Sequence, residues 1–160
     1  KTTDASEALS IVRAAIDANR YDGFNVIVAD PGEANLLEYD GTLASRTLDP
    51  GIHVLINTGA DGSYTFPDAR SEIAKRQAEN ADRVREVLSP EPDETADEWL
   101  ERGKRILGDH EYGVCIHRPD RGFGTRSSSL LTLYSDGDAD MEFADGPPCE
   151  TAFRPVEGQI

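Results

Sequence analysis

The apolar residues of this chain repeat with two different periods, and each period keeps to its own blocks of sequence. Helical three-four spacing occupies residues 5–19, 70–88 and 95–107, whereas short β-prone runs bounded by Gly, Pro and Asp fill 24–57 and 112–154. Strands that follow one another through short turns pair antiparallel. The sequence therefore predicts an α+β fold, with antiparallel sheets covered by segregated helices.

The first block predicts one helix followed by a meander. Asp4 is placed to cap the helix, and Glu7 to complete a capping box. The apolar run 24–29 is typical of a strand buried on both faces. Further strands are expected at 34–39, 43–48 and 53–57. Together these segments predict a meander of about four strands.

The second half predicts two helices and then more strands. Pro67 suits the first turn of the helix at 70–88, and Thr95 caps the helix that ends before Gly108. The later strands are expected at 112–117, 125–134, 140–144 and 149–154.

The length of 160 residues fits a single domain, 1–160, that can bury a core without disulfides. The apolar fraction of 38%, to which 14 Gly are added, is ordinary for a globular chain. No apolar run approaches the roughly 18 residues of a membrane span. We therefore expect no membrane insertion.

The net charge of the chain indicates which solvent conditions and which classes of binding partner suit it. Asp and Glu number 31 against 16 Lys and Arg, which gives a formal net charge of −15. Such a charge repels phosphate backbones and anionic lipids, so nucleic acid and membrane surfaces are poor partners. A disordered acidic protein is one interpretation. Because the acids are spread through periodic segments, we favour a folded protein in the salt-rich cytosol of a halophilic archaeon.

Cysteine and histidine give no metal signal in the sequence. The spacing of Cys115 and Cys149 fits no zinc pattern, and two cysteines make no disulfide framework. We expect one buried strand thiol and one loop thiol, both reduced. His53, His110 and His117 are scattered and are interpreted as surface or packing residues. No metal site is predicted, and no cofactor is evident.

Two short segments are candidates for chemistry. Arg126 opens an apolar strand between Thr125 and Ser127, where it can hold a carboxylate that the hydroxyls orient. The alternative is an Arg paired with one of the many acids. Asn57 ends a predicted strand, where its amide can donate to a developing oxyanion. The alternative is an Asn that closes a turn.

These segments, taken with two others, resemble one family. The segments are Tyr21-Asp-Gly-Phe-Asn-Val-Ile-Val-Ala-Asp30, Asn57, Tyr112-Gly-Val-Cys-Ile-His117 and Phe123-Gly-Thr-Arg-Ser-Ser-Ser-Leu130. In order and spacing they resemble the NRDE family, also called the transport-and-Golgi-organisation protein 2 family. The resemblance covers only the C-terminal part of that family, whose members begin with Met-Cys and carry an Asn-Arg-Asp-Glu motif. After Asn57 the family's Pro-Trp-containing pattern is replaced by Thr-Gly-Ala-Asp-Gly.

The resemblance implies part of the four-layer αββα fold of the N-terminal-nucleophile hydrolases. In those relatives an N-terminal Cys is the nucleophile. By that analogy Asn57 and Arg126 take supporting catalytic roles, while Tyr21, Asn25, Thr125, Arg126 and Ser127 bind a ligand. Haem and acyl-CoA are the cofactors or ligands that the resemblance implies. It also implies that an N-terminal segment carrying the Cys is absent from this chain. That segment of the same protein would be a binding partner of residues 1–160.

Three hypotheses follow from these observations. The first is a cytosolic protein that binds haem, acyl-CoA or a lipid-like molecule on a hydrolase-like scaffold. The second is an amide hydrolase whose Cys lies in the missing segment. The third is a structural partner domain. If the chain pairs with itself, we expect a homodimer through the sheet edge that the missing segment would cover.

Overall fold

The computed structural model describes residues 4–157, which form three α-helices and four small sheets whose strands all pair antiparallel. This arrangement confirms the predicted α+β class. The helices are α1 (Ala5–Ala18), α2 (Ser71–Val87) and α3 (Ala96–Leu107). The strands are β1 (Phe24–Ala29), β2 (Ala34–Tyr39), β3 (Leu43–Thr47), β4 (Leu55–Ile56), β5 (Gly59–Ala60), β6 (Ser63–Tyr64), β7 (His117–Arg118), β8 (Phe123–Gly124), β9 (Ser128–Leu133), β10 (Ala139–Ala144) and β11 (Arg154–Pro155).

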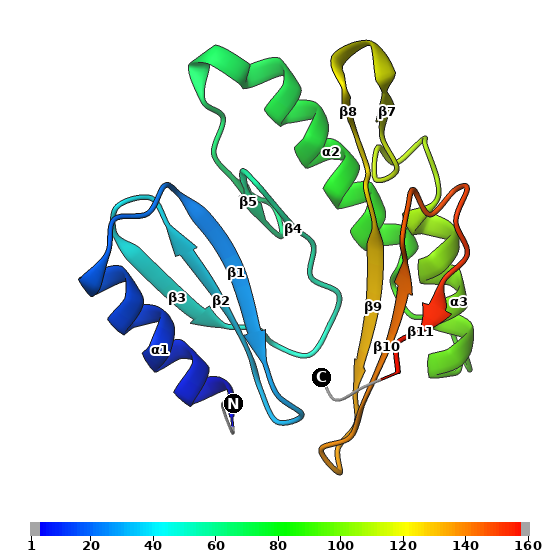
Figure 1. Cartoon of the computed structure of the whole chain (residues 1–160), viewed down its shortest axis with the longest axis horizontal. Coiled ribbons are helices and arrows are strands. Elements are labelled where there is room, and N and C mark those ends of the chain that lie inside the picture. Colours follow the sequence, from blue (N-terminus) through cyan, green and yellow to red (C-terminus); the bar gives the residue numbers. More distant parts are fainter. Residues whose placement is uncertain (1–3, 158–160) are drawn as a thin grey trace.

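The N-terminal part is the sheet β1-β2-β3 with α1 lying along it (Figure 1). Asp4 caps α1 as predicted, since its side chain accepts a hydrogen bond in the first turn. The carboxylate of Asp30 accepts hydrogen bonds from the backbone N–H groups of Ala5, Gly32 and Glu33. These bonds lower the pKa of Asp30, that from Ala5 most strongly. One side chain thus joins the start of α1 to the β1–β2 turn.

The core of this part lies between β2 and the small sheet β4-β5-β6. It consists of Leu36, Leu48 and Ala60, with Ala34 and Leu55 packed against them. The predicted four-strand meander is wrong, because only Leu55–Ile56 of the fourth segment is a strand, and it pairs with β5 and not with β3. The Asp-Pro-Gly turn at 49–51 takes the chain out of the first sheet, where a proline cannot donate to the ladder.

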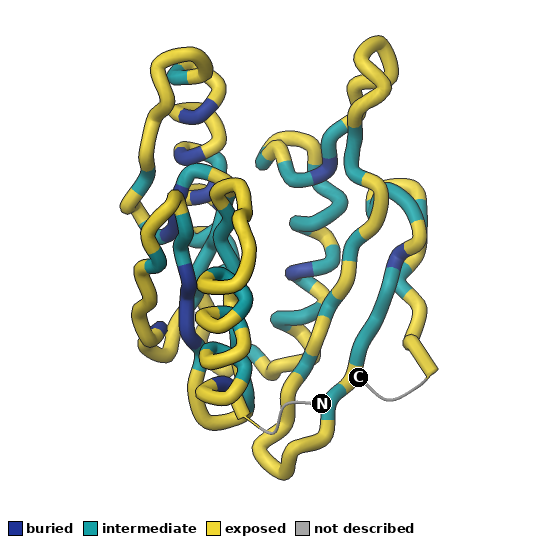
Figure 2. The backbone as a smooth tube through the Cα atoms, turned by 60° about the vertical axis from the view of Figure 1, so that its left-hand side comes forward, coloured by how far each residue is buried: buried dark blue, intermediate teal, exposed yellow. Residues whose placement is uncertain are grey.

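Strand β1 is less buried than its sequence predicts. Among residues 4–157 it pairs only with β2, so that β1 forms one edge of this sheet. Ile27 is 40% exposed, so the expectation of a strand buried on both faces is wrong. The fully buried positions are few and scattered over the elements, as the dark segments in Figure 2 show.

The two central helices lie close to their predicted bounds. Thr95 and Glu98 form a complete capping box at the start of α3, and Gly108 ends it. Arg102 on α3 binds the carboxylate of Glu94 and the backbone carbonyls of Val87 and Ser89. The Arg102 side chain therefore connects α3 to the end of α2 and to the segment between the two helices.

The last third departs most from the prediction. The segment expected as a strand at 112–117 is mostly a turn, because Gly113 adopts a positive φ of 63° and donates to the carbonyl of His110. Strands β9 and β10 form the predicted hairpin. The strand expected at 149–154 is a turn followed by the two-residue β11.

Within residues 4–157, none of the helices has the length and apolar character that crossing a bilayer requires.

Candidate metal centre

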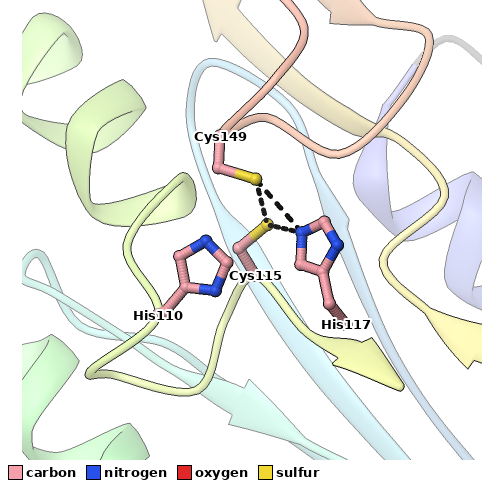
Figure 3. A group of neighbouring side chains, drawn as sticks. All are labelled: His110, Cys115, His117 and Cys149. Atoms are coloured by element: carbon pink, nitrogen blue, oxygen red, sulfur yellow. Dashed lines mark hydrogen bonds between the residues drawn. The ribbon is translucent and has the colours of Figure 1, made fainter. Parts of the chain in front are cut away.

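Four potential metal ligands from two separate segments, the 109–117 loop and the 147–151 turn, converge at one end of α3. They are His110, Cys115, His117 and Cys149, and their ligand atoms all lie within 4.8 Å of one another (Figure 3). The chain has 2 Cys and 3 His in all. Both cysteines and two of the three histidines therefore meet at this site.

The closest atoms are already spaced as ligands of one ion. Cys115 Sγ lies 3.4 Å from Cys149 Sγ and 3.5 Å from His117 Nε2. His117 Nε2 lies 3.1 Å from Cys149 Sγ. The rings of His110 and His117 stack with centroids 5.1 Å apart. Tetrahedral zinc–sulfur and zinc–nitrogen bonds of usual length place two sulfurs about 3.8 Å apart and a sulfur and a nitrogen about 3.5 Å apart.

The loop after α3 supplies three of the four side chains. The helix ends at Gly108, and the backbone N–H of Cys115 then donates back to the carbonyl of Asp109 at 3.4 Å. Gly113 makes the turn, and a Cβ there would lie 2.5 Å from the Asn80 side chain on α2. Arg83 of α2 lies over the Tyr112 ring, 5.0 Å from its centroid. The loop is thereby held against α2, with its ligands directed to one point.

Thr125 fixes the two residues that flank Cys115. Its hydroxyl accepts from the N–H of Ile116 at 2.9 Å and donates to the carbonyl of Val114 at 3.1 Å. Its own N–H donates to the carbonyl of Ile116 at 2.8 Å. The neighbouring Gly124 pairs with His117, and a Cβ on it would lie 2.8 Å from the Ile116 carbonyl. The Gly-Thr pair therefore positions Cys115 and His117 together.

Cys149 comes from a tight turn after β10. The N–H groups of Glu150 and Thr151 both donate to the carbonyl of Pro147 at 2.9 Å. The turn packs on the end of α3, where a Cβ on Gly108 would lie 3.4 Å from Cys149 Cα. The α3 terminus thus contacts the turn that carries the fourth ligand and leads into the loop that carries the other three.

The environment of the two thiols differs. Cys115 is 2% exposed, whereas Cys149, His110 and His117 are on the surface. Desolvation and the contact with the Cys115 thiol raise the pKa of Cys149. Two adjacent sulfurs resist carrying two negative charges, and a divalent cation between them removes that repulsion.

The expectation of two reduced cysteines, one buried and one on a loop, is confirmed, although Cys115 lies in a bend and not on a strand. The sequence did not predict that these thiols and two histidines would form one group that could hold a metal ion. The two Sγ atoms are in contact, and His110 and His117 lie beside them. Sequence spacing missed the site because the fourth ligand follows 32 residues after His117, so no pair of short Cys or His repeats exists. The available signal was that nearly all of the few Cys and His residues flank predicted turns.

The predicted ligand residues fall into two groups that no hydrogen bond among residues 4–157 joins. In the first, the Asn25 amide donates to the carbonyl of Ile56 at 3.1 Å, and Tyr21 lies edge-on to the ring of Phe24. Asn57 is exposed in the β4–β5 turn.

The second group adjoins the metal-ligand cluster. The Thr125 hydroxyl is hydrogen-bonded to the backbone of the loop around Cys115. Arg126 and Ser127 are exposed. One cavity, of about 520 Å³, lies at the α2–α3 link and is lined by acidic and Arg side chains from 91 to 105, away from both groups.

Comparison of this chain with known protein families, with curated proteins and with solved structures gives no match in any of the three.

Proposed function

We propose that the protein binds a zinc ion through His110, Cys115, His117 and Cys149, and that the ion fastens the C-terminal segments to α3. The observation that carries this proposal is the convergence of both cysteines and two of the three histidines within 4.8 Å. None of the four forms an ion pair with another residue of 4–157, so their donor atoms are directed mainly at one another.

The donor set selects the metal. Two sulfurs and two imidazole nitrogens in tetrahedral array are typical of zinc. Calcium and magnesium prefer oxygen ligands. The contacts of 3.4, 3.5 and 3.1 Å are close to the edges of a zinc tetrahedron and need an expansion of only a few tenths of an ångström.

Four protein ligands fill the coordination shell, which is the pattern of structural zinc and leaves no position for substrate. The ion would join the 109–117 loop to the 147–151 turn, in which Cys115 is the one buried hydrophobic residue. Because the ligands are not gathered in the unfolded chain, zinc binding would add directly to the free energy of unfolding.

Zinc titration of the reduced chain tests the proposal. We expect one equivalent to bind and cobalt to give the thiolate charge-transfer and visible bands of a tetrahedral site. Cys115→Ser or Cys149→Ser should reduce the charge-transfer band by about half and lower zinc affinity by at least about 100-fold. His53→Ala is the matched control, because His53 is the one histidine outside the site and should leave binding unchanged. Equal zinc affinity in the wild type and both Cys variants would refute the site.

We also propose a second function, the binding of a haem carboxylate or an acyl-CoA phosphate by Arg126 on the hydrolase-like scaffold that the resemblance implies. One observation favours it. Arg126 is exposed on the segment that supports Cys115, where a ligand anion can reach its guanidinium.

Titration of haem and of an acyl-CoA into the protein checks this second function. Saturable binding that Arg126→Ala weakens and Arg20→Ala leaves unchanged would support it. No saturable change with either ligand would remove it. The amide-hydrolase alternative is tested on the native gene product, by determining its N-terminal residue and assaying amide hydrolysis.

A further inference from the structure

The two thiols of the candidate metal centre form an asymmetric pair. Cys149 is on the surface in a tight turn, whereas Cys115 is buried behind it. Their sulfurs lie 3.4 Å apart and are not joined. An accessible thiolate with a second sulfur directly behind it is the arrangement that allows oxidation to stop at a disulfide.

We propose that the Cys115–Cys149 pair reacts with hydroperoxides and that the resulting disulfide releases the metal. This inference rests on the proposed zinc site. Hydroperoxides are the chemical class of oxidant, and Cys149 is the sulfur they meet first. The site is then a reversible switch between a zinc-bound reduced form and a metal-free oxidised form.

The chemistry balances in two steps. The Cys149 sulfur, kept as a thiolate by the proposed zinc, attacks the terminal, hydroxyl-bearing oxygen of the hydroperoxide, so that an S–O bond forms, the O–O bond breaks and the alkoxide leaves and takes a proton from water. The Cys115 thiolate then attacks the sulfenic sulfur, so that an S–S bond forms and hydroxide leaves and takes a second proton. Two thiolates lose two electrons in all, and the hydroperoxide becomes an alcohol and water.

The geometry permits this closure with little movement. A disulfide requires sulfurs about 2.05 Å apart, so the present 3.4 Å must shorten by about 1.4 Å. Cys149 lies in a turn that is closed by hydrogen bonds from Glu150 and Thr151 to the Pro147 carbonyl, so we expect this turn to move as a unit. Thr125 holds the backbone around Cys115 in place.

Loss of both thiolates would remove the metal. The remaining protein ligands would be His110 and His117, two neutral imidazoles with neither charge nor sulfur to offer. Oxidation to the disulfide should therefore strongly lower zinc affinity, and reduction should restore it.

The test uses the 160-residue chain loaded with one equivalent of zinc and treated with tert-butyl hydroperoxide. Free zinc is followed with a chelating dye and the intact mass by mass spectrometry without reductant. We expect one zinc released per hydroperoxide consumed, a mass about 2 Da below the reduced chain, and reversal of both by a dithiol reductant.

Two variants separate the steps. Cys115→Ser lacks the second sulfur and should accumulate a sulfenic acid at Cys149 that a dimedone probe captures. Cys149→Ser should consume hydroperoxide at least about 10-fold more slowly, because Cys115 is buried. Methionine sulfoxide has the same added mass as a cysteine sulfenic acid. Met141→Leu removes the one methionine of the chain, so that this added mass can then be assigned to a cysteine.

The outcomes distinguish this inference from the proposed function. A reduced chain that takes up no zinc refutes the proposed function before any oxidant is added, and this inference with it. A zinc-loaded chain that keeps its metal after the hydroperoxide is consumed, or that loses it to sulfinic acid without a disulfide, refutes the switch and leaves the zinc site standing.

Discussion

Thr125 is the residue on which the geometry of the metal-ligand loop depends most. Its single hydroxyl bonds the backbone on both sides of Cys115, at Ile116 and at Val114. Thr125→Val keeps the shape and removes both bonds, so we expect zinc affinity to fall by about 10–100-fold, measured by competition with a chelator. Thr125→Ser should retain most of the affinity. Equal loss in both variants would show that side-chain packing and not the hydroxyl holds the loop.

His53 makes a second titratable contact, apart from the metal-ligand cluster. Its Nδ1 lies 2.7 Å from the Asp61 carboxylate and its Nε2 2.7 Å from the carbonyl of Asp49. The bonds to the Asp49 carbonyl and to Asp61 raise the pKa of His53. For Asp61, desolvation is opposed by bonds from His53, Val54 and Arg46, and the net result is a lowered pKa.

The sign of the pH effect follows from these directions. The contribution of His53 is complete below its unfolded pKa of about 6.5 and is lost as pH rises through its higher folded value. We therefore expect His53→Ala to lower the free energy of unfolding by about 1 kcal/mol at pH 5.5 and by clearly less at pH 9, measured by urea denaturation. A difference that stays constant with pH would contradict this contact. Below about pH 4 the wild type should also lose the Asp61 contribution.

The residue types of the metal-ligand cluster were visible in the sequence, but their meeting was not. Cys115 and His117 fall in the segment 112–117, which was predicted to be a strand and would direct both side chains to one face, whereas His110 precedes that segment. Gly113 instead bends the chain, and the fourth ligand arrives from a turn that no local pattern connects to this loop. Tertiary contacts decided what local periodicity could not.

Helix α3 shows the opposite case, an element that its own sequence specifies. Thr95 accepts from the Glu98 N–H while the Glu98 side chain accepts from the Thr95 N–H. Caps and helical spacing are local, so the bounds of all three helices were predicted to within about two residues. Short strands such as β4 and β7 were not, because their pairing depends on distant segments.

The capping box can be tested alone. Thr95→Ala should lower the free energy of unfolding by about 1 kcal/mol, since it leaves the first turn of α3 without its side-chain acceptor. Thr42→Ala is the matched control on an exposed turn and should change stability by less than about 0.5 kcal/mol. Thermal unfolding of the two variants checks this, and equal effects would contradict the cap.

At the scale of the whole molecule the chain buries little. Its accessible surface is 11198 Å², whereas a compact protein of 17.4 kDa has about 7,900 Å². The two largest fully buried side chains are Leu36 and Leu37, both on β2. A molecule with so small a core gains more than usual from a metal that joins its segments.

The net charge of −15 also affects the stability of the fold, because the acidic side chains repel one another. Raising KCl from 0.1 to 2 M shortens the Debye length from about 10 Å to below about 3 Å and so screens the self-repulsion of the acids. We expect the thermal midpoint to rise, by roughly 2–4 °C for each kcal/mol gained. Sucrose at equal osmolality, which leaves charges unscreened, is the control. An unchanged midpoint in KCl would contradict the interpretation of a fold suited to high salt.

The zinc site is the central claim, and X-ray absorption at the zinc edge of the one-equivalent complex tests it most directly. Coordination by His110, Cys115, His117 and Cys149 predicts two sulfur scatterers at about 2.3 Å and two nitrogen scatterers at about 2.0–2.1 Å. A shell of oxygen or nitrogen alone, with no sulfur, would contradict it.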